Sequence, residues 1–133
     1  CLLMRTLLLL ASFAAACGAQ STAPKLGEDI KVRFNAAVRI PSDTTTVRFT
    51  GVTSDSRCPS GAQCVWAGEA TVVFTVGGVQ QVALGLQPGS TPGTAIVGMY
   101  QITLVALDPY PAVNKSIAKS EYVATIRFDS AKD

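Results

Sequence analysis

The chain has 133 residues, of which 48% are apolar and 15% charged, and its formal net charge at pH 7 is +2. This length suits one small domain with its own core, and the lysines and arginines are too few and too scattered for a nucleic-acid-binding surface. The sequence contains no histidine, so it lacks the most common general base and metal ligand. We expect no metal and no cofactor.

Residues 1–16 are predicted to be a signal peptide. Met4 is the expected initiator, Arg5 supplies a positive charge, and residues 6–16 form a mainly apolar run. This run is too short for a transmembrane helix, which needs about 20 apolar residues. A short basic start followed by such a run is typical of a secretory leader.

The end of the leader predicts a lipid anchor at Cys17. Three alanines stand directly before this cysteine, and the junction resembles a bacterial lipobox, although Ala14 occupies the place where lipoboxes usually have leucine. The resemblance implies that Cys17 becomes the acylated first residue of the mature chain, held in the membrane by its acyl chains. The alternative is ordinary cleavage nearby, which leaves Cys17 as a free thiol.

Residues 17–27 are predicted to be a lipidated tether, because they are small, polar and without period. Residues 28–130 are predicted to be a single β-domain. The expected location is the extracytoplasmic side of a bacterial cell envelope. Gly18 directly after the anchor resembles the outer-membrane class of Gram-negative lipoproteins.

Alternating apolar residues predict β-strands through most of the domain. The predicted strands are 30–40, 45–52, 70–76, 79–86, 96–107 and 122–128. Gly77-Gly78 between two of them is typical of a hairpin turn, and no apolar period of 3.6 residues persists. Six to eight short strands indicate an all-β fold, either an antiparallel β-sandwich or a partly closed barrel.

Residues 55–69 carry most of the distinctive chemistry of the chain. Cys58 and Cys64 lie six positions apart beside a proline and a glycine, which in an exported protein predicts a local disulfide. Two alternatives are a metal site, which needs four ligands that the chain does not offer, and a redox pair, which typically has C-x-x-C spacing at a helix start.

The same stretch contains candidate binding residues. Trp66 is expected to pack against the disulfide or the sheet edge, with a ligand anchor as the alternative. Arg57 is expected to pair with Asp55 or Glu69, or to lie over the Trp66 ring; otherwise all three charges are solvated and contribute little. Tyr110 is a second candidate anchor.

Loops 53–67, 87–94 and 108–120 are expected to cluster at one end of the domain. Recognition sites are often built from loops on a rigid frame, and the disulfide-closed loop would be the most rigid of the three. Trp66, in that loop, or Tyr110, in loop 108–120, is the expected anchor for a partner.

Two segments resemble a family of small bacterial lipoproteins and secreted proteins whose activity is not known. They are residues 52–69, V-T-S-D-S-R-C-P-S-G-A-Q-C-V-W-A-G-E, and residues 100–110, Y-Q-I-T-L-V-A-L-D-P-Y, followed by Y-V-A-T at 122–125. The resemblance covers most of the mature chain. The resemblance implies that this chain has the domain of that family, but it does not indicate a biochemical activity.

The predicted function is therefore that of a binding or structural lipoprotein. No histidine can activate a serine or threonine, and two nearby carboxylates are weak support for catalysis, so an enzyme is not expected. The expected partners are the membrane, through Cys17, and an envelope or extracellular protein. A loop-presenting protease inhibitor is the alternative, and an enzyme is a more remote one.

Overall fold

A computed structural model describes residues 25–41 and 43–131, which form eight β-strands. The strands are β1 (Asp29–Arg33), β2 (Ala37–Arg39), β3 (Thr46–Asp55), β4 (Ala70–Val76), β5 (Gln80–Leu86), β6 (Thr94–Val97), β7 (Tyr100–Asp108) and β8 (Val123–Ser130). One short 3₁₀ turn, η2 (Lys119–Glu121), precedes β8. The predicted signal peptide, Cys17 and most of the predicted tether lie outside the described residues.

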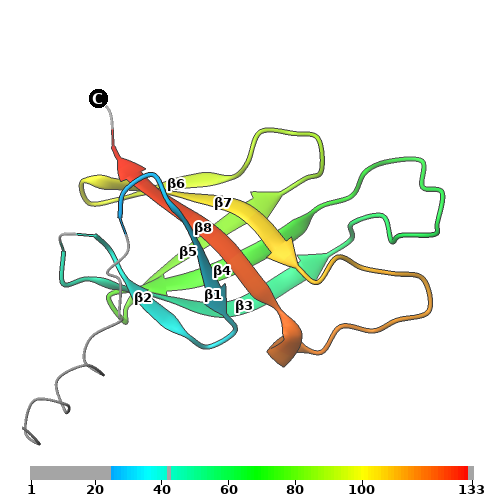
Figure 1. The fold of residues 1–133 in the computed structure, drawn as a ribbon, viewed down its shortest axis with the longest axis horizontal. Helices are drawn as coiled ribbons and strands as arrows, with labels where there is room; N and C mark the ends of the chain where they lie inside the picture. The colour runs from blue at the N-terminus through cyan, green and yellow to red at the C-terminus, as the bar shows by residue number, and fades with distance from the viewer. Residues whose placement is uncertain (1–24, 42, 132–133) are drawn as a thin grey trace, which may run out of the picture.

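The strands form two four-stranded antiparallel sheets that pack face to face (Figure 1). One sheet has the order β1-β8-β7-β6 and the other the order β2-β3-β4-β5. β3, β4 and β5 follow one another as a meander, as do β6, β7 and β8. The predicted all-β sandwich is confirmed, with two separate sheets rather than a barrel.

The core lies between the sheets because alternate residues of each strand point inward. In β4 the first, third, fifth and seventh residues are buried, and the fifth is Phe74. Its ring lies 5.7 Å from that of Phe49 on β3. Other fully buried residues are Val32, Ile40, Val47, Val72, Leu84, Ile102, Leu104, Ile126 and Phe128.

Two predicted strands are each interrupted in the structure. The stretch 30–40 breaks at Asn35, whose φ of 67° lies in the left-handed region, which asparagine tolerates better than most residues. The chain there passes from one sheet to the other. The stretch 96–107 folds back at Gly98 (φ 58°) and becomes the β6–β7 hairpin.

The two ends of the sandwich are distinct. Tyr100 at the start of β7 pairs with Ser130, whereas Asp108 at its end pairs with Val123. Leu26 lies at the Tyr100 end, where it lines a hollow with Met99. The long β3–β4 and β7–β8 loops lie at the opposite end (Figure 1). No helix within residues 25–41 or 43–131 is long and apolar enough to cross a membrane.

Candidate functional site

Three loops meet at the end of the sandwich remote from Leu26 (Figure 1). Two of them are the cysteine loop (residues 56–69, between β3 and β4) and the β7–β8 loop (residues 109–122). They are joined by backbone hydrogen bonds from Ser60 N to the Pro111 oxygen, 2.9 Å, and from Val113 N to the Ser60 oxygen, 3.1 Å. Gln87, from the third loop, lines a pocket with the cysteine loop. The expected clustering of three loops is found.

The Arg57 side chain holds this end together. The residue is only 3% exposed, and its guanidinium binds Asp55 through two bonds, Nε to Oδ1 at 2.7 Å and Nη2 to Oδ2 at 2.8 Å. Nη1 donates to the Leu107 oxygen at 2.7 Å and Nη2 to the Pro109 oxygen at 3.1 Å. Arg57 therefore ties the start of the cysteine loop to the end of β7.

Of the two predicted partners of Arg57, Asp55 forms the ion pair and Glu69 does not. The guanidinium carbon lies 5.1 Å from the centre of the Tyr110 ring, so its cation–π partner is Tyr110 rather than Trp66. The interpretation in which all three charges are solvated is wrong for Arg57 and Asp55. Both side chains are largely removed from water, and a buried arginine requires this full set of acceptors.

Tyr122 completes the cluster, and the sequence offered no sign of its role. Its hydroxyl donates a hydrogen bond of 2.9 Å to Oδ2 of Asp55, 67 positions earlier in the chain. Burial raises the pKa of Asp55, but the hydrogen bonds and charge of Arg57 and the bond from Tyr122 outweigh this and hold that pKa below its ordinary value. Burial and the Asp55 carboxylate raise the pKa of Tyr122 to about 12.

The raised pKa of Tyr122 predicts a loss of stability between pH 10 and about 12. In the unfolded chain the phenol ionises near its ordinary value of 10.0, while the folded protein retains the proton up to about 12. Rising pH therefore favours the unfolded state through this interval. Urea unfolding across the interval should show a steeper decline for the wild type than for Tyr122→Phe, which has no group to ionise. Parallel declines would contradict the assignment.

The lowered pKa of Asp55 acts in the opposite direction. Its stabilising effect is present above the ordinary value of 3.8 and is lost as the pH falls through the lower folded-state value. At neutral pH both groups therefore favour the folded state, with the carboxylate ionised and the phenol protonated.

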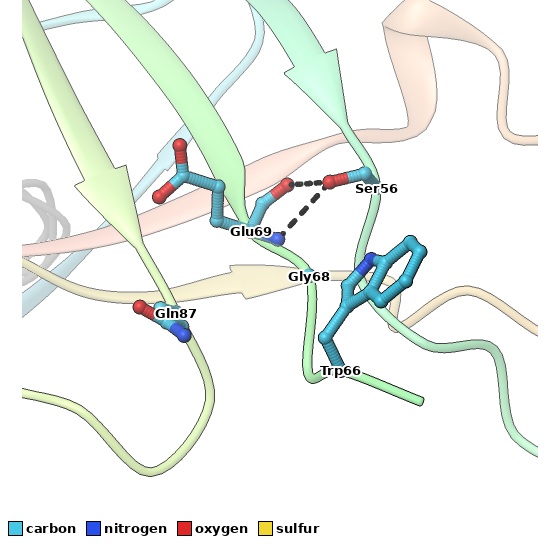
Figure 2. Close-up of a pocket in the computed structure, with 5 residues that line it drawn as sticks. All are labelled: Ser56, Trp66, Gly68, Glu69 and Gln87. Atoms are coloured by element: carbon cyan, nitrogen blue, oxygen red, sulfur yellow. Dashed lines mark hydrogen bonds between the residues drawn. The ribbon is translucent and has the colours of Figure 1, made fainter. Parts of the chain in front are cut away.

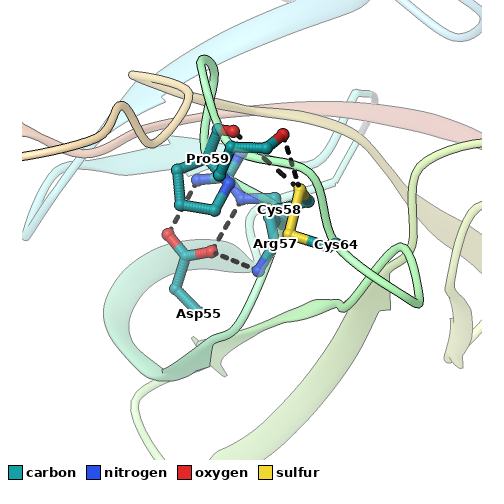
Figure 3. The surroundings of a disulfide bond; sticks show 6 residues. Asp55, Arg57, Cys58, Pro59 and Cys64 are labelled. Carbon is teal, nitrogen blue, oxygen red and sulfur yellow. Dashed lines mark hydrogen bonds and ion pairs between the residues drawn. A yellow bond between two sulfur atoms is a disulfide. The ribbon is translucent and has the colours of Figure 1, made fainter.

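The predicted disulfide between Cys58 and Cys64 is formed, with a Cα–Cα distance of 5.9 Å. Figure 3 shows it beside the Asp55–Arg57 pair. Cys58 N also donates to the Ala67 oxygen at 3.2 Å. The loop is thus closed covalently near its tip and anchored by Arg57 at its base.

Replacing both cysteines with serine is expected to lower the free energy of unfolding by about 2 kcal/mol, because the small ring no longer restricts the unfolded chain. Urea denaturation of the oxidised wild type and of the Cys58→Ser/Cys64→Ser variant measures the difference. Reduction of the wild type should have nearly the same effect. An unchanged midpoint in both cases would show that the ring does not contribute to stability.

The expectation that Trp66 packs against the disulfide or the sheet edge is wrong. Trp66 is 73% exposed, and Val65 beside it is 94% exposed. We name these two exposed residues, which lie between Cys64 and Ala67 on the returning arm of the cysteine loop, the loop tip. The disulfide and the hydrogen bonds to the β7–β8 loop close this end of the sandwich without a contribution from the indole.

Glu69 and Gln87 lie side by side because of the sheet register. Ala70 at the start of β4 pairs with Leu86 at the end of β5, so Glu69 and Gln87 are the first residues beyond two adjoining strands. With Ser56, Trp66 and Gly68 they line an open pocket of about 270 Å³ (Figure 2). Sequence spacing indicated Glu69 as a candidate but not Gln87, whose position depends on the β4–β5 pairing.

The described part of the chain contains no group of three or more Cys, Asp or Glu side chains placed to hold a metal ion. No family model, curated protein or solved structure matches the chain. Inferences about function therefore depend on the geometry of this loop end.

Proposed function

We propose that this chain is an exported, lipid-anchored binding protein of the bacterial cell envelope. Its recognition element is the loop tip, Val65 and Trp66, supported by the Cys58–Cys64 ring. The observation that carries the proposal is the 94% and 73% exposure of these two apolar side chains on a loop that is closed covalently.

Adjacent exposed apolar residues on a rigid support are characteristic of a binding surface. Tryptophan is enriched among the residues that contribute most to binding energy. A loop that is already ordered loses little conformational entropy when it binds. Here the order comes from the disulfide and from Arg57, which is buried beneath the loop. Arg57 and Asp55, two of the predicted binding residues, therefore support the surface, and Tyr110 packs against Arg57.

The direction of the chain supports a tethered arrangement. The described chain begins at the end of the sandwich formed by Leu26 and Met99, and β7 runs from that end to the loop end over 9 residues, a length of roughly 26 Å. Seven residues separate Cys17 from Lys25. A lipid anchor at Cys17 would therefore hold the Leu26 end near the bilayer and direct the loop tip away from it.

Photo-crosslinking in the native bacterium tests the recognition element. A benzophenone side chain at position 66 of the full chain should form a covalent adduct with an envelope macromolecule. The matched control is position 79, in the β4–β5 turn at the opposite end, where Val79 is 89% exposed. Adducts at 66 that exceed those at 79 several-fold support the proposal. Equal yields at the two positions would contradict it.

Mass spectrometry of the processed N-terminus tests the anchor separately. The expected peptide begins with Cys17 carrying a thioether-linked diacylglycerol, and Cys17→Ser should release the protein from the membrane fraction. An unmodified Cys17 thiol, or unchanged membrane association of the variant, would contradict the anchor without affecting the recognition element.

A further inference from the structure

The pocket beside the loop tip combines one aromatic face with several polar groups. It is lined by Ser56, Trp66, Gly68, Glu69 and Gln87. Figure 2 shows the indole on one side of the Gly68 backbone and both the Glu69 carboxylate and Gln87 on the other. An apolar surface with a few placed polar groups is the usual composition of a small-ligand site.

The floor of this pocket is held rigidly. The Ser56 hydroxyl donates to the Glu69 backbone oxygen at 3.0 Å and accepts from the Glu69 backbone N–H at 3.1 Å. Gly68 lies so close to the Ser56 backbone that no larger residue fits there. The backbone of Glu69 is therefore fixed by bonds that do not involve its carboxylate, and the side chain extends into solvent.

The polar groups restrict the class of ligand. The pocket lining includes one carboxylate and one amide, but no lysine or arginine. An anionic ligand would be repelled by Glu69 and would find no cation among these residues. A neutral polyhydroxylated ligand is favoured, because carboxylate and amide oxygens accept hydrogen bonds from hydroxyl groups and the amide N–H₂ also donates.

The exposed indole restricts the ligand further. The face of an aromatic ring carries partial negative charge and attracts the slightly positive C–H groups of a flat aliphatic ring. A hexopyranose ring has such C–H faces and a rim of hydroxyl groups, which matches a pocket with an indole on one side and a carboxylate and an amide on the other. The volume of about 270 Å³ is just below the range of roughly 300–1,000 Å³ that is usual for ligand pockets, so the pocket has room for no more than one sugar ring.

We propose that this pocket binds one hexopyranose ring of a neutral glycan, stacked on Trp66 and hydrogen-bonded by Glu69 and Gln87. The inference depends on the proposed function and names the chemical class of its ligand. A single ring contacting an open site binds weakly, with a dissociation constant on the order of 1 mM.

The fluorescence of Trp66 reports binding directly, because it is the only tryptophan in the chain. The full chain in detergent micelles is titrated with three neutral tetrasaccharides: chitotetraose, cellotetraose and maltotetraose. At least one should saturably change the emission of Trp66. Tetragalacturonate, which is anionic, should not change it.

Two variants test whether the sugar binds in this pocket or elsewhere on the surface. Glu69→Ala should weaken neutral-sugar binding about tenfold or more through loss of a charge-assisted hydrogen bond. Its urea midpoint should be unchanged, because only the backbone of Glu69 holds the loop. Val79→Ala, at the opposite end, should bind as the wild type does.

Three outcomes would overturn this inference: no emission change with any neutral tetrasaccharide, saturable binding of tetragalacturonate alone, or unaltered binding by Glu69→Ala. If position 66 forms a protein adduct but no neutral tetrasaccharide changes the Trp66 emission, the glycan ligand is rejected and the proposed binding function is retained. If no neutral tetrasaccharide changes the Trp66 emission and crosslinking is equal at positions 66 and 79, both the glycan ligand and the proposed recognition element are rejected.

Discussion

Replacing Arg57 with methionine is expected to lower the free energy of unfolding by about 3–5 kcal/mol. Methionine matches the length of the arginine stem, so little packing is lost. The guanidinium, however, is the bidentate partner of Asp55 and the donor to the Leu107 and Pro109 oxygens. Without it, a largely buried carboxylate lacks its counter-charge and two backbone oxygens lose their donor.

Arg127→Met is the matched control for this loss. Arg127 also forms an ion pair, with Asp29 at 2.7 Å, but the two side chains remain 39% and 47% exposed. Exposed pairs contribute about 1 kcal/mol or less. Urea denaturation should therefore show a much larger loss of unfolding free energy for Arg57→Met than for Arg127→Met. Equal losses would show that the Arg57 cluster is not a structural support.

Much of the fold could be predicted because period-two alternation is a strong signal. The β4–β5 hairpin was indicated by β-branched residues on either side of Gly77-Gly78, and the structure places its strands close to the predicted bounds. The change of sheet at Asn35 was not predicted. Both sheets face one core, so a chain crossing between them continues to point alternate residues inward, and the alternation does not reveal the crossing.

The local part of the site was predictable, and the long-range part was not. The disulfide partners are six positions apart and Asp55 is two positions from Arg57, so their spacing suggests each contact. Tyr122 and the Leu107 oxygen reach this cluster only through the register of β7 and β8. The exposure of Trp66 was missed because an isolated tryptophan in a loop carries no period that indicates its burial.

Gly68→Ala is expected to lower the free energy of unfolding by about 3 kcal/mol or more, through backbone strain and steric overlap together. Gly68 has a φ of +69°, and a Cβ atom there would lie 1.8 Å from the Ser56 backbone oxygen. The backbone of one arm of the cysteine loop must therefore move. That movement would break the paired hydrogen bonds between Ser56 and Glu69.

Gly78→Ala distinguishes the two contributions. Gly78 also has a positive φ, +79°, but no atom lies within 4 Å of the position that an alanine Cβ would occupy, so its substitution costs only the left-handed backbone penalty of about 1–2 kcal/mol. Urea denaturation should rank Gly68→Ala as the more damaging variant. Its Trp66 emission should also change in the folded state, because the pocket floor shifts, whereas Gly78→Ala should leave that emission unaltered. Equal losses with unchanged emission would mean that the two arms of the loop separate freely, and the rigid support inferred for the loop tip would then be absent.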